Sequence, residues 1–171
     1  KKIIEKYSSD KRGLVLDYKE SDELIKYFEY PFSVNRTLFG RFSESRIYKL
    51  AEKLLNQNVY LFSMEIHSRV SRGSSIPPHQ DNAYYGLNNG KALTFYIPLN
   101  SQNPEEGGLR YCANKIEAQY EHEMSNEKGF SLTLKEKNLI KKFDNLDPFF
   151  SAGDCTVHSS RSVHYANEVP A

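Results

Sequence analysis

Alternating apolar and polar side chains constrain the fold of this chain more than any other feature. Residues 59–69, VYLFSMEIHSR, carry an apolar side chain at every second position, and residues 92–100, ALTFYIPLN, repeat the pattern. Successive side chains of a β-strand point to opposite faces of a sheet. Both stretches therefore predict strands with one apolar face, and Thr94 and Tyr96 lie on the other face of the second strand.

Three further short strands are predicted next to turn residues. They are GLVLDY from residue 13, GGLRYCAN from residue 107 and AGDCTVHSS from residue 152. Short strands broken by turns favour an antiparallel sandwich or barrel. We therefore expect a mainly β protein with flanking helices.

Helices are predicted near the start of the chain and within an insertion. SDELIKYFEY (21–30) offers Ser21 as a cap and three apolar residues on one face, and SESRIYKLAEKLLNQN (43–58) has five at helical spacing. Residues 1–58 are therefore expected to form a mostly helical support for a β core over residues 59–171. Within that core, the charged segment 115–146 interrupts the strands, and Thr133 with Glu136 forms a capping-box pattern that predicts a helix.

Length and charge narrow the class of protein. A chain of 171 residues is about the size of one domain. It carries 23 Lys and Arg against 22 Asp and Glu, so no net field attracts nucleic acid or an anionic membrane. Charged residues follow Ile4 at once, so we expect no signal peptide; no apolar run reaches the ~20 residues of a membrane span, and Cys112 and Cys155 lie far apart. We expect a soluble cytoplasmic protein with free thiols, and its oligomeric state is left open.

The stretch PPHQDNAYY, residues 77–85, holds the strongest candidate for a chemical site. Residues two apart on a strand point to the same side, so His79 and Asp81 can present an imidazole and a carboxylate to one cavity. Either His158 or His164 could supply a third ligand. Two histidines and one carboxylate on one face of an octahedral metal form the facial triad of non-haem Fe(II) oxygenases. A histidine two residues from an aspartate also occurs by chance, so the spacing alone does not establish a metal site.

Four segments together resemble one known family. PPHQDNAYY, LTFYIPLN, EEGGLRY and AGDCTVHSSRSVHYAN follow one another like the landmarks of the phytanoyl-CoA dioxygenase family of Fe(II)/2-oxoglutarate oxygenases. The resemblance covers about residue 59 to the end of the chain and is weakest in the charged insertion. It implies a double-stranded β-helix, or jelly-roll, core that binds Fe(II) and 2-oxoglutarate.

The resemblance assigns the metal ligands to three residues. The family's proximal ligands fall on His79 and Asp81. Its distal histidine falls on His164, because this residue precedes the YAN that matches the family pattern. His158 is then a neighbour of the site or a packing residue.

Two strands are expected to contact the co-substrate. The strand 59–69 resembles the one that flanks the 2-oxoglutarate pocket, and its polar face includes Ser63 and His67. Tyr96, with Thr94 beside it, takes the position where family members carry an aromatic residue over the co-substrate. Each residue also has a plainer interpretation, as an ordinary strand residue, a solvated strand end or a core aromatic.

One family feature is not found in this chain. The family anchors the distal carboxylate of 2-oxoglutarate with an arginine on the strand after the distal histidine, and this chain ends seven residues past His164. We expect that strand to lie beyond Ala171. Otherwise Arg69, Arg72 or Arg110 substitutes, or the co-substrate binds in another way.

The reaction that the resemblance implies is a hydroxylation. The middle ligand is an aspartate, not the glycine or alanine of the family's halogenating relatives. The enzyme would hydroxylate an unactivated carbon of a small-molecule metabolite with O2, and 2-oxoglutarate would yield succinate and CO2. Both histidine ligands must be neutral to bind a metal, so affinity is expected to fall as the pH drops through their pKa values.

Alternatives to this reaction remain open at the level of sequence. One is a non-catalytic jelly-roll module that binds a sugar or a sensor ligand, and another is a cupin-type metalloenzyme that does not use 2-oxoglutarate. The insertion 115–146 is either a substrate lid or a solvated surface excursion. The identity of the substrate does not follow from the sequence.

Overall fold

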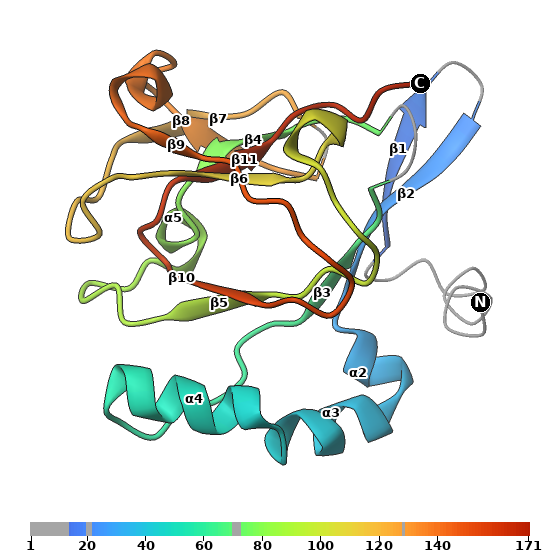
Figure 1. Cartoon of the computed structure of the whole chain (residues 1–171), viewed down its shortest axis with the longest axis vertical. Coiled ribbons are helices and arrows are strands. Elements are labelled where there is room, and N and C mark those ends of the chain that lie inside the picture. The colour runs from blue at the N-terminus through green and yellow to red at the C-terminus, as the bar shows by residue number, and fades with distance from the viewer. Residues whose placement is uncertain (1–13, 20–21, 70–72, 128) are drawn as a thin grey trace. The chain divides into compact units, whose positions relative to one another are not determined.

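The computed structural model describes residues 14–19, 22–69, 73–127 and 129–171. The chain divides into two compact units, residues 1–68 and 69–171, each with its own elements (Figure 1). Ser21 and Arg72, named above as a helix cap and a candidate anchor, lie outside the described residues. That the whole chain forms one oxygenase domain stays a prediction.

The described residues of the first unit combine a small antiparallel sheet with three helices. Its strands pair in the order β1-β2-β3 and are β1 (Leu14–Lys19), β2 (Asp22–Glu29) and β3 (Glu65–His67). Its helices are α2 (Pro31–Val34), α3 (Arg36–Ser43) and α4 (Arg46–Leu55). The strand expected from residue 13 is confirmed as β1, and the helix expected over 43–58 is confirmed as α4. The Ser45 hydroxyl accepts a hydrogen bond from the Tyr48 N–H at its start, and Asn56 ends it in the left-handed conformation.

Two expectations for this unit are wrong. A helix was expected over 21–30, but residues 22–29 form β2, which pairs with β1 on one side and β3 on the other. Apolar residues at 24, 25 and 28 fit either period over so short a stretch, and pairing to two neighbours decides between them. The strand expected over 59–69 is reduced to Glu65–His67, the three residues that pair with β2. The described residues at the start of the chain therefore combine a sheet with helices.

The described part of the second unit has two main sheets, besides a two-stranded hairpin in the insertion. One has four strands in the order β4-β11-β6-β9, and the other pairs β10 with β5. Their bounds are β4 Ile76–His79, β5 Leu93–Tyr96, β6 Leu109–Cys112, β9 Asn145–Leu146, β10 Thr156–Ser159 and β11 His164–Ala166. Figure 1 shows the two sheets as separate layers, the arrangement of a jelly roll. The strands expected at 92–100, 107–114 and 152–160 are confirmed as β5, β6 and β10. Short helices α5 (Asn82–Tyr85) and η1 (Pro104–Glu106) lie in the connections.

The helix expected in the insertion, residues 115–146, is reduced to one short 3-10 helix, and Thr133 does not cap it. The insertion forms the hairpin β7 (His122–Met124) and β8 (Leu132–Leu134), the 3-10 helix η2 (Leu139–Lys142) and strand β9. Thr133 lies inside β8, and its hydroxyl donates a hydrogen bond to the Pro78 carbonyl, so it caps no helix. The alternation of Leu132, Thr133 and Leu134 is a strand signal that the charged surroundings obscure.

The insertion also contributes to the core of the second unit. One buried apolar cluster joins residues from β6, β8, η2, the loop before β11 and β11 itself: Cys112, Leu134, Leu139, Val163 and Tyr165. Both cysteines are free, as expected, and Cys112 is buried in this cluster. The insertion is therefore packed into the unit along part of its length.

Replacing Leu139 with alanine should destabilise the protein. The side chain is 8% exposed within the apolar cluster, and removing a buried leucine side chain costs about 2–5 kcal/mol. Urea unfolding should show a lower midpoint with an unchanged slope. A loss below about 0.5 kcal/mol, the range of surface substitutions, would contradict the packing described for the insertion.

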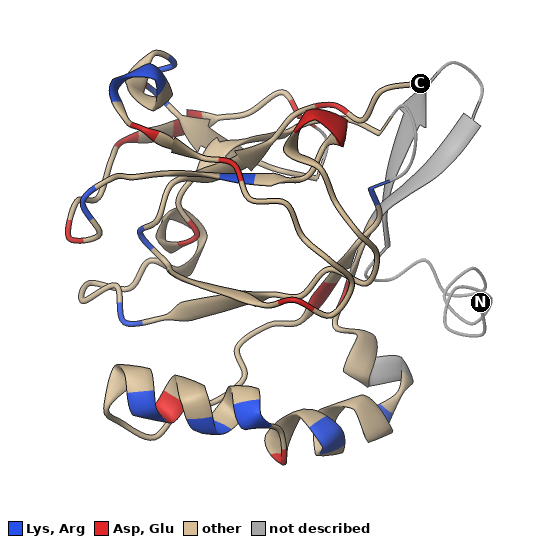
Figure 2. Cartoon of the chain, viewed as in Figure 1, with Lys and Arg blue, Asp and Glu red and all other residues tan. Residues whose placement is uncertain are grey.

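The distribution of charged residues and the character of the helices bear on nucleic-acid and membrane partners. Figure 2 shows basic and acidic residues of the second unit spread over several loops and strands. None of the helices in the described part of the chain is long and apolar enough to cross a membrane. That nucleic acid and membranes are not partners, and that the protein is cytoplasmic, stay predictions.

Candidate metal centre

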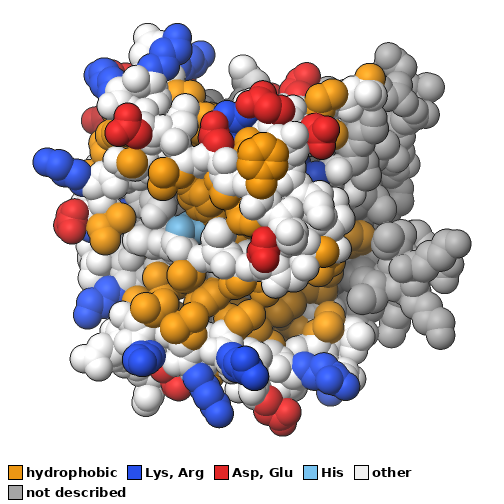
Figure 3. Space-filling model, in the orientation of Figure 1, with side chains coloured by type: hydrophobic (Ala, Val, Ile, Leu, Met, Phe, Trp, Pro, Cys, Tyr) orange, Lys and Arg blue, Asp and Glu red, His pale blue; other side chains and the backbone are white. Residues whose placement is uncertain are grey.

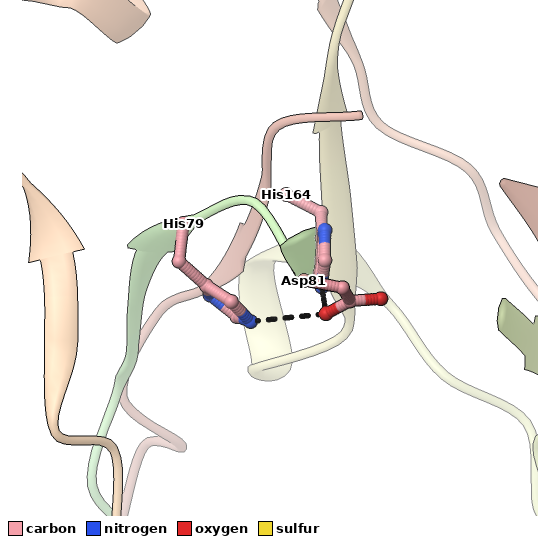
Figure 4. A group of neighbouring side chains, drawn as sticks. All are labelled: His79, Asp81 and His164. Atoms are coloured by element: carbon pink, nitrogen blue, oxygen red, sulfur yellow. Dashed lines mark ion pairs between the residues drawn. The ribbon is translucent and has the colours of Figure 1, made fainter. Parts of the chain in front are cut away.

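Three side chains from the four-stranded sheet converge on one point (Figure 4). His79 ends β4, Asp81 follows it at the start of α5, and His164 begins β11 directly opposite His79. The Nε2 atoms of His79 and His164 each lie 3.5 Å from Asp81 Oδ1. One ligand atom from each residue lies within 4.8 Å of the other two, and all three side chains are buried. Strand register places His79 opposite His164, and the turn from β4 into α5 adds Asp81, so the three residues named from the sequence come together.

Backbone carbonyls fix which nitrogen each histidine offers. His79 Nδ1 lies 2.8 Å from the Pro77 carbonyl oxygen, and His164 Nδ1 lies 3.0 Å from the Ser162 carbonyl oxygen. A carbonyl oxygen only accepts, so each Nδ1 carries the proton and each Nε2 keeps its lone pair. Bonds of this kind orient histidine ligands in metal sites. Two imidazole nitrogens and one carboxylate oxygen form a donor set that suits Fe(II).

The Asp81 carboxylate divides its oxygens between two sets of partners. Oδ1 faces His79 and His164, whereas Oδ2 accepts a 2.6 Å hydrogen bond from the Thr94 hydroxyl and lies 3.4 Å from His158 Nε2. Thr94 on β5 and His158 on β10 are paired directly across the second sheet. His79 and His164 therefore share one carboxylate oxygen, whereas His158 faces the other. This geometry supports His164 as the third ligand.

His158 belongs to a row of buried polar groups that ends at Asp81. Its Nδ1 lies 3.2 Å from the Tyr111 hydroxyl, which lies 2.8 Å from the Thr156 hydroxyl. Although His158 Nε2 is buried, it makes no hydrogen bond within the described part of the chain. Sequence analysis missed Tyr111. Because Tyr111 sits directly opposite His164 in the β6–β11 pair, only the strand register could have identified it.

Burial and neighbouring groups set the charges of the site. Burial alone raises the pKa of a carboxyl group, but His164, together with His158 and His79, outweighs it and holds the pKa of Asp81 well below its usual range. Burial lowers the pKa of His164 to about 3, and Asp81 opposes this only in part. An ionised carboxylate and a neutral imidazole are the forms that bind a metal. Protons should therefore compete with a metal for His164 only at a lower pH than the sequence alone suggests.

The low pKa of His164 predicts that the metal-free protein loses stability in acid. The ordinary pKa of 6.5 applies in the unfolded chain and a pKa of about 3 in the folded one. Between these values the unfolded state holds more protons than the folded state. The free energy of unfolding is therefore highest above pH 6.5 and falls as the pH drops. The slope is about 1.4 kcal/mol per pH unit for one such group.

Urea unfolding of the metal-free protein between pH 7 and pH 4 measures this loss. His164→Gln is the control, because an amide does not titrate. The variant should lose stability less steeply than the wild type, and equal slopes would contradict a neutral buried His164.

The remaining candidates for co-substrate binding have partners of their own. Ser63 and His67 lie in the first unit, where the Ser63 hydroxyl is 3.5 Å and His67 Nε2 is 2.9 Å from the Glu65 carboxylate. Tyr96 donates a hydrogen bond from its hydroxyl to Gln102 Oε1. Contact of these residues, and of Thr94, with 2-oxoglutarate stays a prediction.

Both described arginines that were candidates for the carboxylate anchor are engaged with protein atoms. The Arg69 guanidinium donates to three backbone carbonyl oxygens. Arg110 forms ion pairs with Glu105 at 2.6 Å and with Asp147 at 2.7 Å. These partners argue against either arginine as the anchor of the distal carboxylate of 2-oxoglutarate.

Fold and site together define a jelly-roll protein with a two-histidine, one-carboxylate group suited to a metal. The chain matches the phytanoyl-CoA dioxygenase (PhyH) family over residues 5–169 and belongs to that family. A search of curated protein sequences finds no match.

Solved structures share this fold at low sequence identity. EctD from S. alaskensis, crystallised with 2-oxoglutarate and 5-hydroxyectoine, superposes with a TM-score of 0.72 at 16% identity, covering 99% of this chain and 61% of EctD. EvdO2 from Micromonospora carbonacea var. aurantiaca, complexed with 2-oxoglutarate, gives 0.71 at 16% identity, covering 97% of this chain and 74% of EvdO2. The epimerase SnoN, in complex with Fe3+, alpha ketoglutarate and nogalamycin RO, gives 0.67 at 19% identity, covering 97% of this chain and 68% of SnoN. The jelly-roll expectation is confirmed, and the chain spans about three-fifths of the length of EctD.

Proposed function

We propose that this chain forms the Fe(II)- and 2-oxoglutarate-dependent oxygenase domain of an enzyme that oxidises a small molecule. The observation that carries the proposal is the buried group of His79, Asp81 and His164, with both Nε2 atoms left free by hydrogen bonds at Nδ1. Membership of the family supports it, as do solved relatives that bind iron and 2-oxoglutarate. The metal, with 2-oxoglutarate and O2, supplies the oxidising chemistry when bound.

In this proposal, the residues of the chain hold the metal, orient its ligands and shield the site from water. His79, Asp81 and His164 hold the metal through Nε2, Oδ1 and Nε2. Because Thr94 and His158 face the other Asp81 oxygen, the carboxylate would offer a metal one oxygen, as in a two-histidine, one-carboxylate site. The three side chains are buried, which limits the contact of the site with water. Figure 3 shows a small area of histidine surface near the middle of one face.

Hydroxylation of an unactivated carbon, with release of succinate and CO2, is the reaction that we propose. The aspartate at position 81 occupies the ligand position that a halogenating relative leaves to chloride. Incorporation of labelled oxygen from 18O2 into the product tests this outcome. A product without the label would instead indicate a reaction such as epimerisation or ring closure on the same metal centre.

Anaerobic titration with Fe(II) followed by 2-oxoglutarate is the experiment that tests the function. A chelating co-substrate should produce a weak visible charge-transfer band that disappears when a metal chelator is added. Bound metal without the band would favour a cupin-type enzyme that does not use 2-oxoglutarate. A protein that binds no metal would favour the non-catalytic binding module.

A further inference from the structure

Gln80, the residue between the two proximal ligands, uses every hydrogen-bonding position of its side chain. Nε2 donates to the carbonyl oxygens of Ala118 at 2.8 Å and Arg161 at 2.6 Å. Oε1 accepts from the Tyr120 backbone N–H at 2.8 Å and from Gln119 Nε2 at 3.2 Å. An amide side chain has two N–H donors and two lone pairs, so none is left for water. The side chain is completely buried.

The partners of this amide come from two segments. Residues 118–120 belong to the insertion, whereas Arg161 lies in the loop between β10 and β11, three residues before His164. One side chain therefore links the turn that follows His79 both to the insertion and to the loop that leads to the distal histidine.

Two more hydrogen bonds join the insertion to the same turn. The Gln80 backbone N–H donates to His122 Nε2 at 3.1 Å, and His122 Nδ1 is bonded to a backbone carbonyl. The Thr133 hydroxyl donates to the Pro78 carbonyl at 3.2 Å. The insertion is thus bonded to the residues on both sides of His79.

We infer that Gln80 is a positioning residue that sets the spacing between the proximal and distal metal ligands, with the insertion acting as a bracket for the metal centre and not as a lid. This inference rests on the proposed metal site. A buried amide with four partners is held in one rotamer, because any other leaves buried groups unpaired at about 1–3 kcal/mol each. Loss of the amide frees the loop that carries His164 to shift relative to His79. Substitution of residues that orient metal ligands typically weakens metal binding by about 10–100-fold.

Gln80→Glu and Gln80→Met test the inference. Glutamate keeps the shape but places an ionised oxygen against the carbonyls of Ala118 and Arg161, and methionine removes all four hydrogen bonds. The readouts are the Fe(II) dissociation constant, from anaerobic competition with a chelator, and the Co(II) absorption spectrum, which reports coordination geometry. Both variants should bind Fe(II) about 10–100-fold more weakly and show an altered Co(II) spectrum.

Leu139→Ala is the matched control, because it destabilises the same insertion without touching the amide. If Gln80 were merely structural, its variants would behave like this control, with a lower unfolding midpoint but unchanged Fe(II) affinity and Co(II) spectrum. That result would overturn the inference. A wild-type protein that binds neither metal would refute the proposed site instead. If neither Gln80 variant folds, Thr133→Val, which removes one bond of the bracket, should still weaken Fe(II) binding severalfold, and unchanged affinity there would overturn the inference.

Discussion

Asp81→Ala is expected to abolish Fe(II) binding and 2-oxoglutarate turnover. Oδ1 of this residue is the one oxygen that faces both His79 Nε2 and His164 Nε2, each at 3.5 Å. Substituting a residue that hydrogen-bonds to a metal ligand already lowers metal affinity by about 10–100-fold. Loss of the ligand itself should therefore lower it by more than about 100-fold. Anaerobic equilibrium dialysis with an iron assay measures the binding, and an oxygen electrode measures the turnover.

Thr94→Val is the graded comparison for this variant. Valine keeps the shape of threonine but removes the hydroxyl that holds Asp81 Oδ2 at 2.6 Å. The ligand remains but is less well oriented, so Fe(II) binding should weaken by about 10-fold. Wild-type Fe(II) affinity in Asp81→Ala would show that the metal, if any, is bound elsewhere. An equal loss in both variants would indicate that Thr94 does more than orient the carboxylate.

The strands that build the site could be predicted because their signals are local. The period of two places Thr94 and Tyr96 on the polar face of β5, and in the structure Thr94 reaches Asp81 from that face. His79 and Asp81 were expected to share a side through alternation along one strand, but β4 ends at His79 and Asp81 begins α5, so a turn and not strand alternation brings them together. The choice of His164 as the distal histidine depended on a resemblance to known sequences, because the sequence of one strand does not show which residues of a distant strand it pairs with.

What the sequence did not reveal depends on contacts between distant segments. Gln80 looked like the outward residue of a strand, yet its partners are 38 to 81 positions away in the chain. β2 carries apolar spacing that suits a helix, and only its pairing with β1 and β3 makes it a strand. The charged composition of the insertion says nothing of the buried residues, such as Leu134 and Leu139, by which it packs. Tertiary hydrogen bonds and packing thus decided each case that local patterns left ambiguous.

His164→Ala should remove Fe(II) binding, whereas His158→Ala should keep it with at most an about 10-fold loss. Both histidines are buried, and their rings lie 4.6 Å apart, centroid to centroid. They differ in the oxygen that they face, because His164 Nε2 approaches Asp81 Oδ1 and His158 Nε2 approaches Oδ2. The measurement is again anaerobic equilibrium dialysis, with added imidazole as a second readout. Imidazole should restore Fe(II) binding to His164→Ala, since a free ring can take the place of the lost ligand, and should leave His158→Ala unchanged.

If His158→Ala removed Fe(II) binding and His164→Ala kept it, the metal would have to bind the other oxygen of the Asp81 carboxylate. A metal bound by His158 would have to be shared with Oδ2, the oxygen to which the Thr94 hydroxyl already donates at 2.6 Å. Thr94→Val would then strengthen Fe(II) binding by freeing that oxygen, whereas with His164 as the ligand it weakens binding. The sign of the Thr94 effect therefore distinguishes the two assignments independently of the histidine variants, even if one of those variants is too unstable to study.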